Sequence, residues 1–306
     1  MRYKFKRMEN RWLDKSEYPF TSNYFNVNGH NLHFIDEGEG EPLLFVHGTP
    51  SWSFDFRNVI KKLKATYRCI AIDHIGFGLS DKPQHYDYST QNHSFTLEKF
   101  ILDQQLHDIT LIVHDFGGPI GLNFAIRYPQ KIKRIVILNS WLWSSKTDPD
   151  YKKMSKILKS PLLPILYRCL NFSPRCILPK SFGDHKLSKR LLKQYTKPFA
   201  EKSQRNGPLA FAKSLLNDQD WFEELWSAHH TISDKPTLLI WGMKDPVIKP
   251  HYLSRFEHGF KNASIVRLAT SGHFPQEEEP DKVAEAIFDF LSKEKRMATK
   301  ANTSGR

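Results

Sequence analysis

The stretch that decides the fold is Asp108-Ile109-Thr110-Leu111-Ile112-Val113-His114-Asp115-Phe116-Gly117-Gly118-Pro119-Ile120-Gly121-Leu122. The apolar, β-branched run at its start is typical of a strand buried in a parallel sheet. The run ends at a glycine-rich turn and passes directly into a helical pattern over residues 120–128. A strand, a sharp turn and a helix in this order form the context of a nucleophile elbow. The sequence therefore predicts that Asp115 presents a nucleophile at the tip of the turn.

A carboxylate at this tip predicts a particular chemistry. An aspartate with an ordinary pKa of about 3.9 is ionised at neutral pH, so it needs no base before it attacks. It can displace a leaving group from a saturated carbon and become an alkyl ester. The ester must then be hydrolysed by a water molecule that a base activates.

Composition indicates a globular protein with one large core and a smaller inserted domain. The chain has 306 residues, of which 40% are hydrophobic and 25% charged. No run approaches the roughly 18–20 apolar residues of a membrane span, and no apolar segment of a secretory signal follows the basic N-terminus. The three cysteines, Cys69, Cys169 and Cys176, have no CxxC spacing. We therefore expect a cytoplasmic protein without disulfides.

The net charge of +12 raises the question of an anionic partner. Between residues 146 and 205, however, lysines and arginines are scattered at helical spacing among leucines, as on solvated helix faces. No helix-turn-helix, RNA-recognition or zinc-finger pattern is present, so we expect no nucleic-acid partner. Loose association with an anionic surface stays open, and the sequence leaves the oligomeric state undetermined.

Strand-like and helix-like patterns alternate along most of the chain. The strand-like runs are 24–27, 30–36, 42–46, 67–72, 109–115, 133–139, 236–242 and 263–268. Helical patterns lie between most of the later runs and after the last, and Asn28-Gly29 predicts a hairpin between the first two. This alternation predicts an α/β fold with a mostly parallel eight-stranded sheet and helices on both faces.

One long segment interrupts the alternation. Residues 141–231 have amphipathic helical patterns, separated by prolines, and no clear strand. We predict that they form a helical cap inserted into a core made of residues 1–140 and 232–293. The polar, basic tail at 294–306 is expected to be disordered.

Ligands bind beyond the carboxyl ends of parallel strands, so the residues after each strand are the candidates for catalysis. His273 follows the last strand and is the candidate base. Asp245 follows the preceding strand and can hold the imidazole of His273 in the useful tautomer. The order Asp115, Asp245, His273 is the nucleophile–acid–base order of hydrolases with this elbow. The backbone N–H groups of Thr49 and Phe116 are expected to form an oxyanion hole.

Each of these residues also has an ordinary structural explanation when it is taken alone. Asp115 can be a helix N-cap, Asp245 a turn residue before a proline, and His273 a surface histidine. Three such residues in this order after these strands favour the catalytic explanation. The histidine pairs of the chain lack carboxylates at metal-site spacing, so we expect neither a metal nor a cofactor.

Four motifs give the chain a resemblance to a known family. They are His47-Gly48-Thr49-Pro50-Ser51-Trp52-Ser53-Phe54, Asp73-His74-Ile75-Gly76-Phe77-Gly78-Leu79-Ser80, His114-Asp115-Phe116-Gly117-Gly118-Pro119 and Gly272-His273-Phe274. With them the chain, from about residue 18 to 291, resembles the haloalkane dehalogenase-like and epoxide hydrolase-like branch of the α/β-hydrolase superfamily. The resemblance implies a hydrolase that acts on a small apolar organic substrate through a covalent ester. Hydrolysis of a carbon–halogen bond is the first expectation, and epoxide or lactone substrates are the alternatives.

The chain departs from the family at two positions. Haloalkane dehalogenases usually carry Trp after the nucleophile, where its indole N–H holds the halide, whereas Phe116 has no side-chain N–H. Several also have Asn at the position of Thr49. Trp141 and Trp143 can supply an indole N–H or can be core aromatics. For an epoxide, the candidate proton donors are the cap tyrosines Tyr151, Tyr167 and Tyr195.

Two rival functions follow from these departures and from the charge. One is a ligand-binding homologue that retains the fold without turnover. The other is a basic surface that docks on nucleic acid or membrane.

Overall fold

The computed structural model describes the backbone of residues 10–304 and the side chains of residues 10–294. Its centre is one eight-stranded sheet in the order β1-β2-β4-β3-β5-β6-β7-β8. The strands are β1 (Asn23–Val27), β2 (His30–Glu37), β3 (Pro42–Val46), β4 (Arg68–Ile72), β5 (Ile109–Asp115), β6 (Ile132–Ser140), β7 (Thr237–Gly242) and β8 (Ala263–Leu268). The pairs β1–β2 and β2–β4 are antiparallel, and the other pairs are parallel. The predicted fold class is confirmed.

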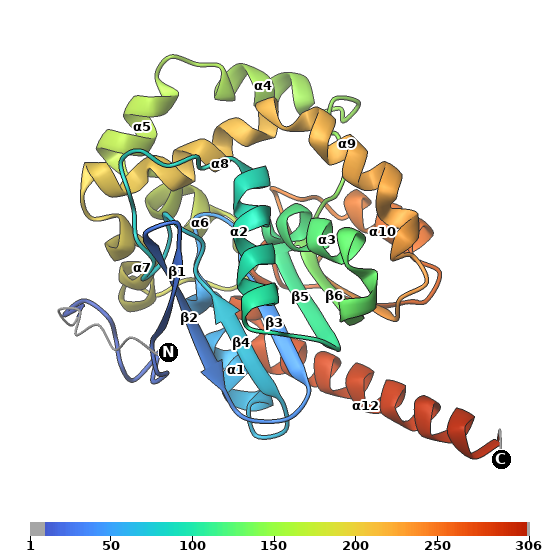
Figure 1. Ribbon diagram of the computed structural model, residues 1–306. Coiled ribbons are helices and arrows are strands. Elements are labelled where there is room, and N and C mark those ends of the chain that lie inside the picture. Colours follow the sequence, from blue (N-terminus) through green and yellow to red (C-terminus); the bar gives the residue numbers. More distant parts are fainter. Residues whose placement is uncertain (1–9, 305–306) are drawn as a thin grey trace.

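Helices surround this sheet on both faces (Figure 1). They are α1 (Arg57–Leu63), α2 (Thr90–Asp103), α3 (Gly117–Arg127), α4 (Tyr151–Leu158), α5 (Leu163–Leu170), α6 (Leu178–Lys180), α7 (Lys189–Thr196), α8 (Asn206–Asn217), α9 (Gln219–Ala228), α10 (His251–Gly259), α11 (Pro275–Glu278) and α12 (Pro280–Ser304). Helices α2 and α3 pack against each other on one face, and α1 and α12 do so on the other.

Strand β5 lies in the middle of the sheet and is buried along its whole length. Successive side chains of a strand point to opposite faces. Accordingly, Leu111 and Val113 belong to the hydrophobic core under α2 and α3, whereas Ile112 belongs to the core under α1 and α12. A strand covered on both faces needs a continuous apolar run, which is the pattern that the sequence has here. The hydrophobic cores on both faces of the sheet therefore hold β5, and with it the elbow at its end, in place.

Between β6 and β7 the structure has six α-helices, α4 to α9, and no strand. In Figure 1 the helices α4, α5, α8 and α9 arch over one end of the sheet. This arrangement supports the predicted cap, whose limits at residues 141 and 231 stay a prediction.

The C-terminal segment differs from the sequence-based expectation. Helix α12 continues to Ser304, through most of the tail that was expected to be disordered. Residues 294–301 are Glu-Lys-Arg-Met-Ala-Thr-Lys-Ala, most of which are strong helix formers, so they extend a helix that packing has already started. Residues 305 and 306 lie outside the described part of the chain. Among the described helices, none has the length and apolar character that a membrane crossing requires.

Candidate active site

The elbow is formed by Asp115 and the glycines that follow it. Asp115 is the last residue of β5, has a φ of 51°, and is 4% exposed. A side chain at Gly117 would collide with the backbone oxygen of Val46, and one at Gly118 would collide with Ser140. The glycines therefore allow α3 to start close to the neighbouring strands. Phe116, not Asp115, is the N-cap residue of α3, so the helix-capping explanation of Asp115 is wrong.

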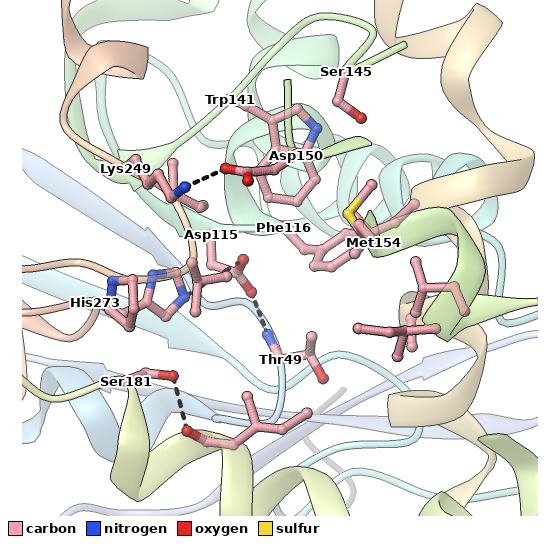
Figure 2. A pocket seen from close by; sticks show the side chains of 18 of the residues that line it. Thr49, Asp115, Phe116, Trp141, Ser145, Asp150, Met154, Ser181, Lys249 and His273 are labelled. Carbon is pink, nitrogen blue, oxygen red and sulfur yellow. Dashed lines mark hydrogen bonds and ion pairs between the residues drawn. The ribbon is translucent and has the colours of Figure 1, made fainter. Parts of the chain in front are cut away.

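Backbone N–H groups bind the carboxylate of Asp115. The Thr49 N–H donates to Oδ2 at 2.7 Å, and the Phe116 N–H also stabilises the ionised form. Burial nevertheless raises the pKa of Asp115 to about 6, against the opposing effect of the nearby His273 charge. Figure 2 shows Asp115 between His273 and Thr49, with the ring of Phe116 beside it.

His273 connects this carboxylate to a second one. Its Nε2 lies 3.7 Å from Asp115 Oδ1, and its Nδ1 lies 2.8 Å from Asp245 Oδ2. The carboxylate of Asp245 accepts a hydrogen bond from Nδ1, so Nδ1 carries a proton and Nε2 faces the nucleophile. Burial opposes protonation of His273, but the Asp245 charge and hydrogen bond outweigh it and raise the pKa to about 8. At 3% exposure, His273 is not a surface histidine.

Asp245 is itself held rigidly. Its Oδ1 accepts from the Val247 and Ile248 N–H groups at 2.7 and 2.9 Å. Its Oδ2 accepts from Asn139 Nδ2 at 2.8 Å, in addition to His273. The carboxylate thus keeps one orientation, which fixes the plane of the imidazole.

Asn139 has a function that the sequence did not reveal. It lies in β6 with a φ of 25°. Its Nδ2 also donates to the backbone oxygen of Gly242, and its Oδ1 accepts from the Gly242 N–H. The next residue, Ser140, donates to the backbone oxygen of Asp115 at 2.6 Å. Their place near the carboxyl end of a strand was the available signal, since polar side chains there reach the site.

The site opens into a cavity of about 460 Å³, a usual size for a small-molecule site. Thr49, Asp115, Phe116, Trp141 and His273 all line it, whereas Asp245 lies behind His273. The structure thus brings all of the predicted site residues together.

The candidate leaving-group contacts Thr49, Phe116 and Trp141 all line the cavity but differ in their side-chain groups. Thr49 Oγ1 is buried and has no hydrogen-bond partner among the described residues, so its hydroxyl is free to donate. Phe116 packs edge to face against Trp141, with ring centroids 4.8 Å apart. Trp143 does not line the cavity and packs against Trp226 and Phe256, which makes it a core aromatic.

The cap tyrosines fall into two groups. Tyr151 and Tyr167 line the cavity, and burial raises the pKa of Tyr167 to about 12, so its hydroxyl stays protonated. Tyr195 lies outside the cavity and donates to Glu277, a carboxylate that Arg57 also binds. Tyr195 is therefore not placed to protonate a substrate.

The rim of the cavity is polar and spans the cap and the core. Asp150 pairs with Lys249, as Figure 2 shows, and Asp148 accepts from Tyr252 Oη at 2.7 Å. In the part of the chain that is described, no three His, Cys, Asp or Glu side chains are grouped in a way that suits a metal ion.

Comparison with known proteins gives consistent similarities. A family model described as the alpha/beta hydrolase fold matches residues 41–280. The chain is 34% identical to a cis-3-alkyl-4-alkyloxetan-2-one decarboxylase of Shewanella oneidensis, over 93% of this chain and 92% of that protein. It is 32% identical to haloalkane dehalogenase 2 of Mycobacterium tuberculosis, over 90% of this chain and 96% of that protein.

Solved structures show the same fold at lower identity. A loop variant of haloalkane dehalogenase DbeA from Bradyrhizobium elkanii superposes with a TM-score of 0.82 at 20% identity, covering 92% of this chain and 99% of that one. Haloalkane dehalogenase DatA from Agrobacterium tumefaciens gives a TM-score of 0.80 at 24% identity, covering 89% of this chain and 96% of that one.

Proposed function

Since the chain belongs to the α/β-hydrolase fold family, and within it to the haloalkane dehalogenase-like group, we propose that it hydrolyses carbon–halogen bonds through an ester on Asp115. It is an enzyme of the α/β-fold hydrolase type. The observation that carries the proposal is a buried carboxylate held on backbone N–H groups, with the imidazole of His273 3.7 Å away.

The first step is displacement of the halide by Asp115. Oδ2 accepts a hydrogen bond from the Thr49 N–H, so we assign the attack to a lone pair of Oδ1, the oxygen that lies 3.7 Å from Nε2 of His273. That lone pair forms the new C–O bond while the C–X bond breaks and its electron pair leaves with the halide. The Thr49 hydroxyl, which has no other partner among the described residues, is available to bind the departing anion.

The second step is hydrolysis of the ester. Nε2 of His273 accepts a proton from a water molecule, whose oxygen attacks the ester carbon of Asp115. Charge then develops on Oδ2, next to the N–H groups of Thr49 and Phe116. Collapse of this intermediate expels the alcohol, which takes a proton, and restores the carboxylate. The sum is R–X and water giving R–OH, a proton and the halide.

The two steps are coupled through charge. The ionised Asp115 is one of the groups that raise the pKa of His273 to about 8. Esterification removes that charge, so the pKa of His273 falls in the intermediate. The imidazole therefore becomes a neutral base in the step that needs one.

Trapping of the ester tests the mechanism. His273→Phe lacks the base for the second step, so incubation with 1-bromohexane should add one hexyl group to the peptide that contains Asp115, seen by mass spectrometry. His230→Phe replaces an exposed histidine and should show no accumulated adduct. Asp115→Asn in the His273→Phe background should also show none. An unmodified Asp115 across bromoalkanes, epoxides and lactones would contradict the mechanism.

A second candidate reaction is decarboxylation of a β-lactone. Two observations favour it: Phe116 offers no side-chain N–H to a halide, and the relative at 34% identity is a decarboxylase of cis-3-alkyl-4-alkyloxetan-2-ones. Attack of Asp115 on C4 of such a ring breaks the C4–O bond and frees the ring carboxylate. The C3–carboxylate bond then breaks to give CO2, its electrons form the C=C bond, and Asp115 leaves as a carboxylate.

The products distinguish the two candidates. Inversion at C4 followed by anti elimination converts a cis lactone into a cis alkene, without consumption of water. We therefore offer the enzyme 1-bromohexane and a cis-3,4-dialkyloxetan-2-one separately. Bromide with hexanol supports hydrolysis of halides, and CO2 with cis alkene alone assigns the enzyme to the second reaction.

A further inference from the structure

The outer helices of the cap expose an unusual group of aliphatic side chains. Ile157, Leu162, Ile165 and Leu170 are each more than half exposed to solvent. They are four of the eight large exposed hydrophobic residues among the described side chains, and they lie within 14 consecutive positions. Leu162 is the N-cap residue of α5 and has helical backbone angles, so its spacing of three from Ile165 makes the two side chains neighbours at the start of the helix.

The same segment is strongly basic. Residues 151–175 contain no Asp or Glu. They contain six cationic residues, all exposed, namely Lys152, Lys153, Lys156, Lys159, Arg168 and Arg175. In the described part of the chain, none of these six forms an ion pair, whereas the nearby lysines Lys146 and Lys249 pair with Asp220 and Asp150. We call residues 151–175 the basic apolar face.

This face lies at the periphery of the molecule. In Figure 1, α4 and α5 form the outer edge of the cap, with α8 between them and the sheet. Lys153 and Ile157 line the cavity of the candidate active site and are exposed as well. The basic apolar face therefore forms one border of the mouth of the cavity, and exposed core residues such as Val247 and Lys249 form the other.

Charge and side-chain type select among the possible partners. In an isologous contact between two copies, this face would meet itself, so twelve like charges would be brought together at a desolvated contact. A nucleic-acid surface calls for aromatic stacking beside the cations, but the exposed apolar residues here are aliphatic. Aliphatic side chains beside unpaired lysines match a bilayer. The aliphatic side chains can be buried in its acyl region, and its anionic headgroups attract the lysines.

We propose that the basic apolar face docks the enzyme on the surface of a bilayer that contains anionic lipid. Leu162 and Ile165 enter the headgroup–acyl boundary, and the lysines of α4 contact the headgroups. One border of the cavity mouth then lies at the lipid surface. Docking does not depend on the proposed chemistry, because it is measured without substrate.

Flotation of the full chain with vesicles tests the proposal. Vesicles of phosphatidylcholine with 30% phosphatidylserine should bind the wild-type protein at about 0.1 M salt, and pure phosphatidylcholine vesicles should bind it at least about tenfold more weakly. The double variant Leu162→Ser/Ile165→Ser should lose about tenfold in partitioning. Phe95→Ser/Leu102→Ser on α2 is the matched control, because these side chains are also exposed apolar residues. It should bind as the wild type does.

Charge is tested in the same way. Lys152→Gln/Lys156→Gln/Lys159→Gln should weaken binding about tenfold or more. Lys186→Gln/Lys189→Gln/Lys193→Gln removes three exposed lysines around α7 and should change binding by less than about twofold. Equal loss in both triple variants would show that net charge alone acts and would overturn the proposal. So would absence of vesicle binding, or a dimer in sedimentation that Leu162→Ser/Ile165→Ser dissociates.

Discussion

At the scale of the residue, Phe116 decides how well this site can stabilise a departing halide. Its ring lines the cavity next to Asp115, but the ring has no hydrogen-bond donor for a halide. Thr49 supplies one free hydroxyl. The nucleophile and its base are thus complete, while the leaving-group contacts are reduced.

We predict that Phe116→Trp raises the rate of halide release from 1-bromohexane by about tenfold or more. The reason is that loss of one such donor in other enzymes costs about 10²–10³ in rate. Phe116→Leu, which adds no donor, is the control, and halide electrodes with stopped-flow detection give the rate. A Phe116→Trp variant that folds but releases halide no faster would show that this position does not limit the reaction.

A second prediction at this scale concerns pH. Ester formation needs ionised Asp115, whose pKa is raised to about 6, so the rate should fall as the pH drops through 6. His273 is a cation in the resting site and lowers the pKa of Asp115. In His273→Phe the midpoint should therefore move above 6. The initial rate of halide release, measured for both proteins from pH 5 to 9, checks this shift. An unchanged midpoint would show that the two groups are not coupled.

At the scale of the element, the turn between β5 and α3 depends on close backbone contact. Gly117 faces the backbone oxygen of Val46, which cannot move without disturbing β3. Gly121, one turn later, faces instead the side chain of Val113, at 2.8 Å from an ideal Cβ. The two glycines thus lie in one helix but meet neighbours of different rigidity.

We predict that Gly117→Ala destabilises the protein by about 2 kcal/mol or more, because the added methyl group forces the backbone apart. Gly121→Ala is the matched control and should cost less, since Val113 can adjust and alanine favours the helix by up to about 1 kcal/mol. Urea unfolding of both variants measures the difference. Equal effects would mean that the elbow tolerates a wider turn than its contacts indicate.

At the scale of the whole molecule, buried histidines couple the fold to pH. Burial lowers the pKa of His47, His74, His93 and His114 below 6.5. A histidine whose pKa is lower in the folded than in the unfolded state stabilises the fold above the unfolded pKa. That contribution is lost as the pH falls toward the folded pKa. The protein should therefore lose stability from pH 6.5 downward.

His93 provides the test. Its pKa is lowered to about 3, and both ring nitrogens are without hydrogen-bond partners in the described structure. Between pH 6.5 and 5 this one residue should cost the wild-type fold about 2 kcal/mol. His93→Phe should flatten the fall of Tm over that range, whereas His258→Phe, at an exposed site, should not. A parallel fall in wild type and His93→Phe would contradict the assignment.

The sequence by itself predicted the sheet, the helices on its faces, and the chemistry of the elbow. These features depend on local signals: a continuous apolar run for β5, glycines after Asp115, and a histidine and an aspartate after later strands. Parallel strands place the residues that follow them at one edge of the sheet, so we could predict that these residues lie on the same side of the molecule. The helix in the C-terminal tail was not predicted, because it continues a helix that packing starts before the tail, and the polar composition of the tail does not show that start.

Only the tertiary structure decided what surrounds Asp115. The hydrogen bond of Asn139 to Asp245, the free hydroxyl of Thr49 and the separation of Tyr167 from Tyr195 depend on side chains that are far apart in the sequence. The Asn139–Asp245 distance follows from the pairing of β6 with β7, and the positions of Tyr167 and Tyr195 follow from how the cap packs on the core. No local pattern records either arrangement. The sequence therefore determined the nucleophile, whereas the structure decided which groups face its substrate.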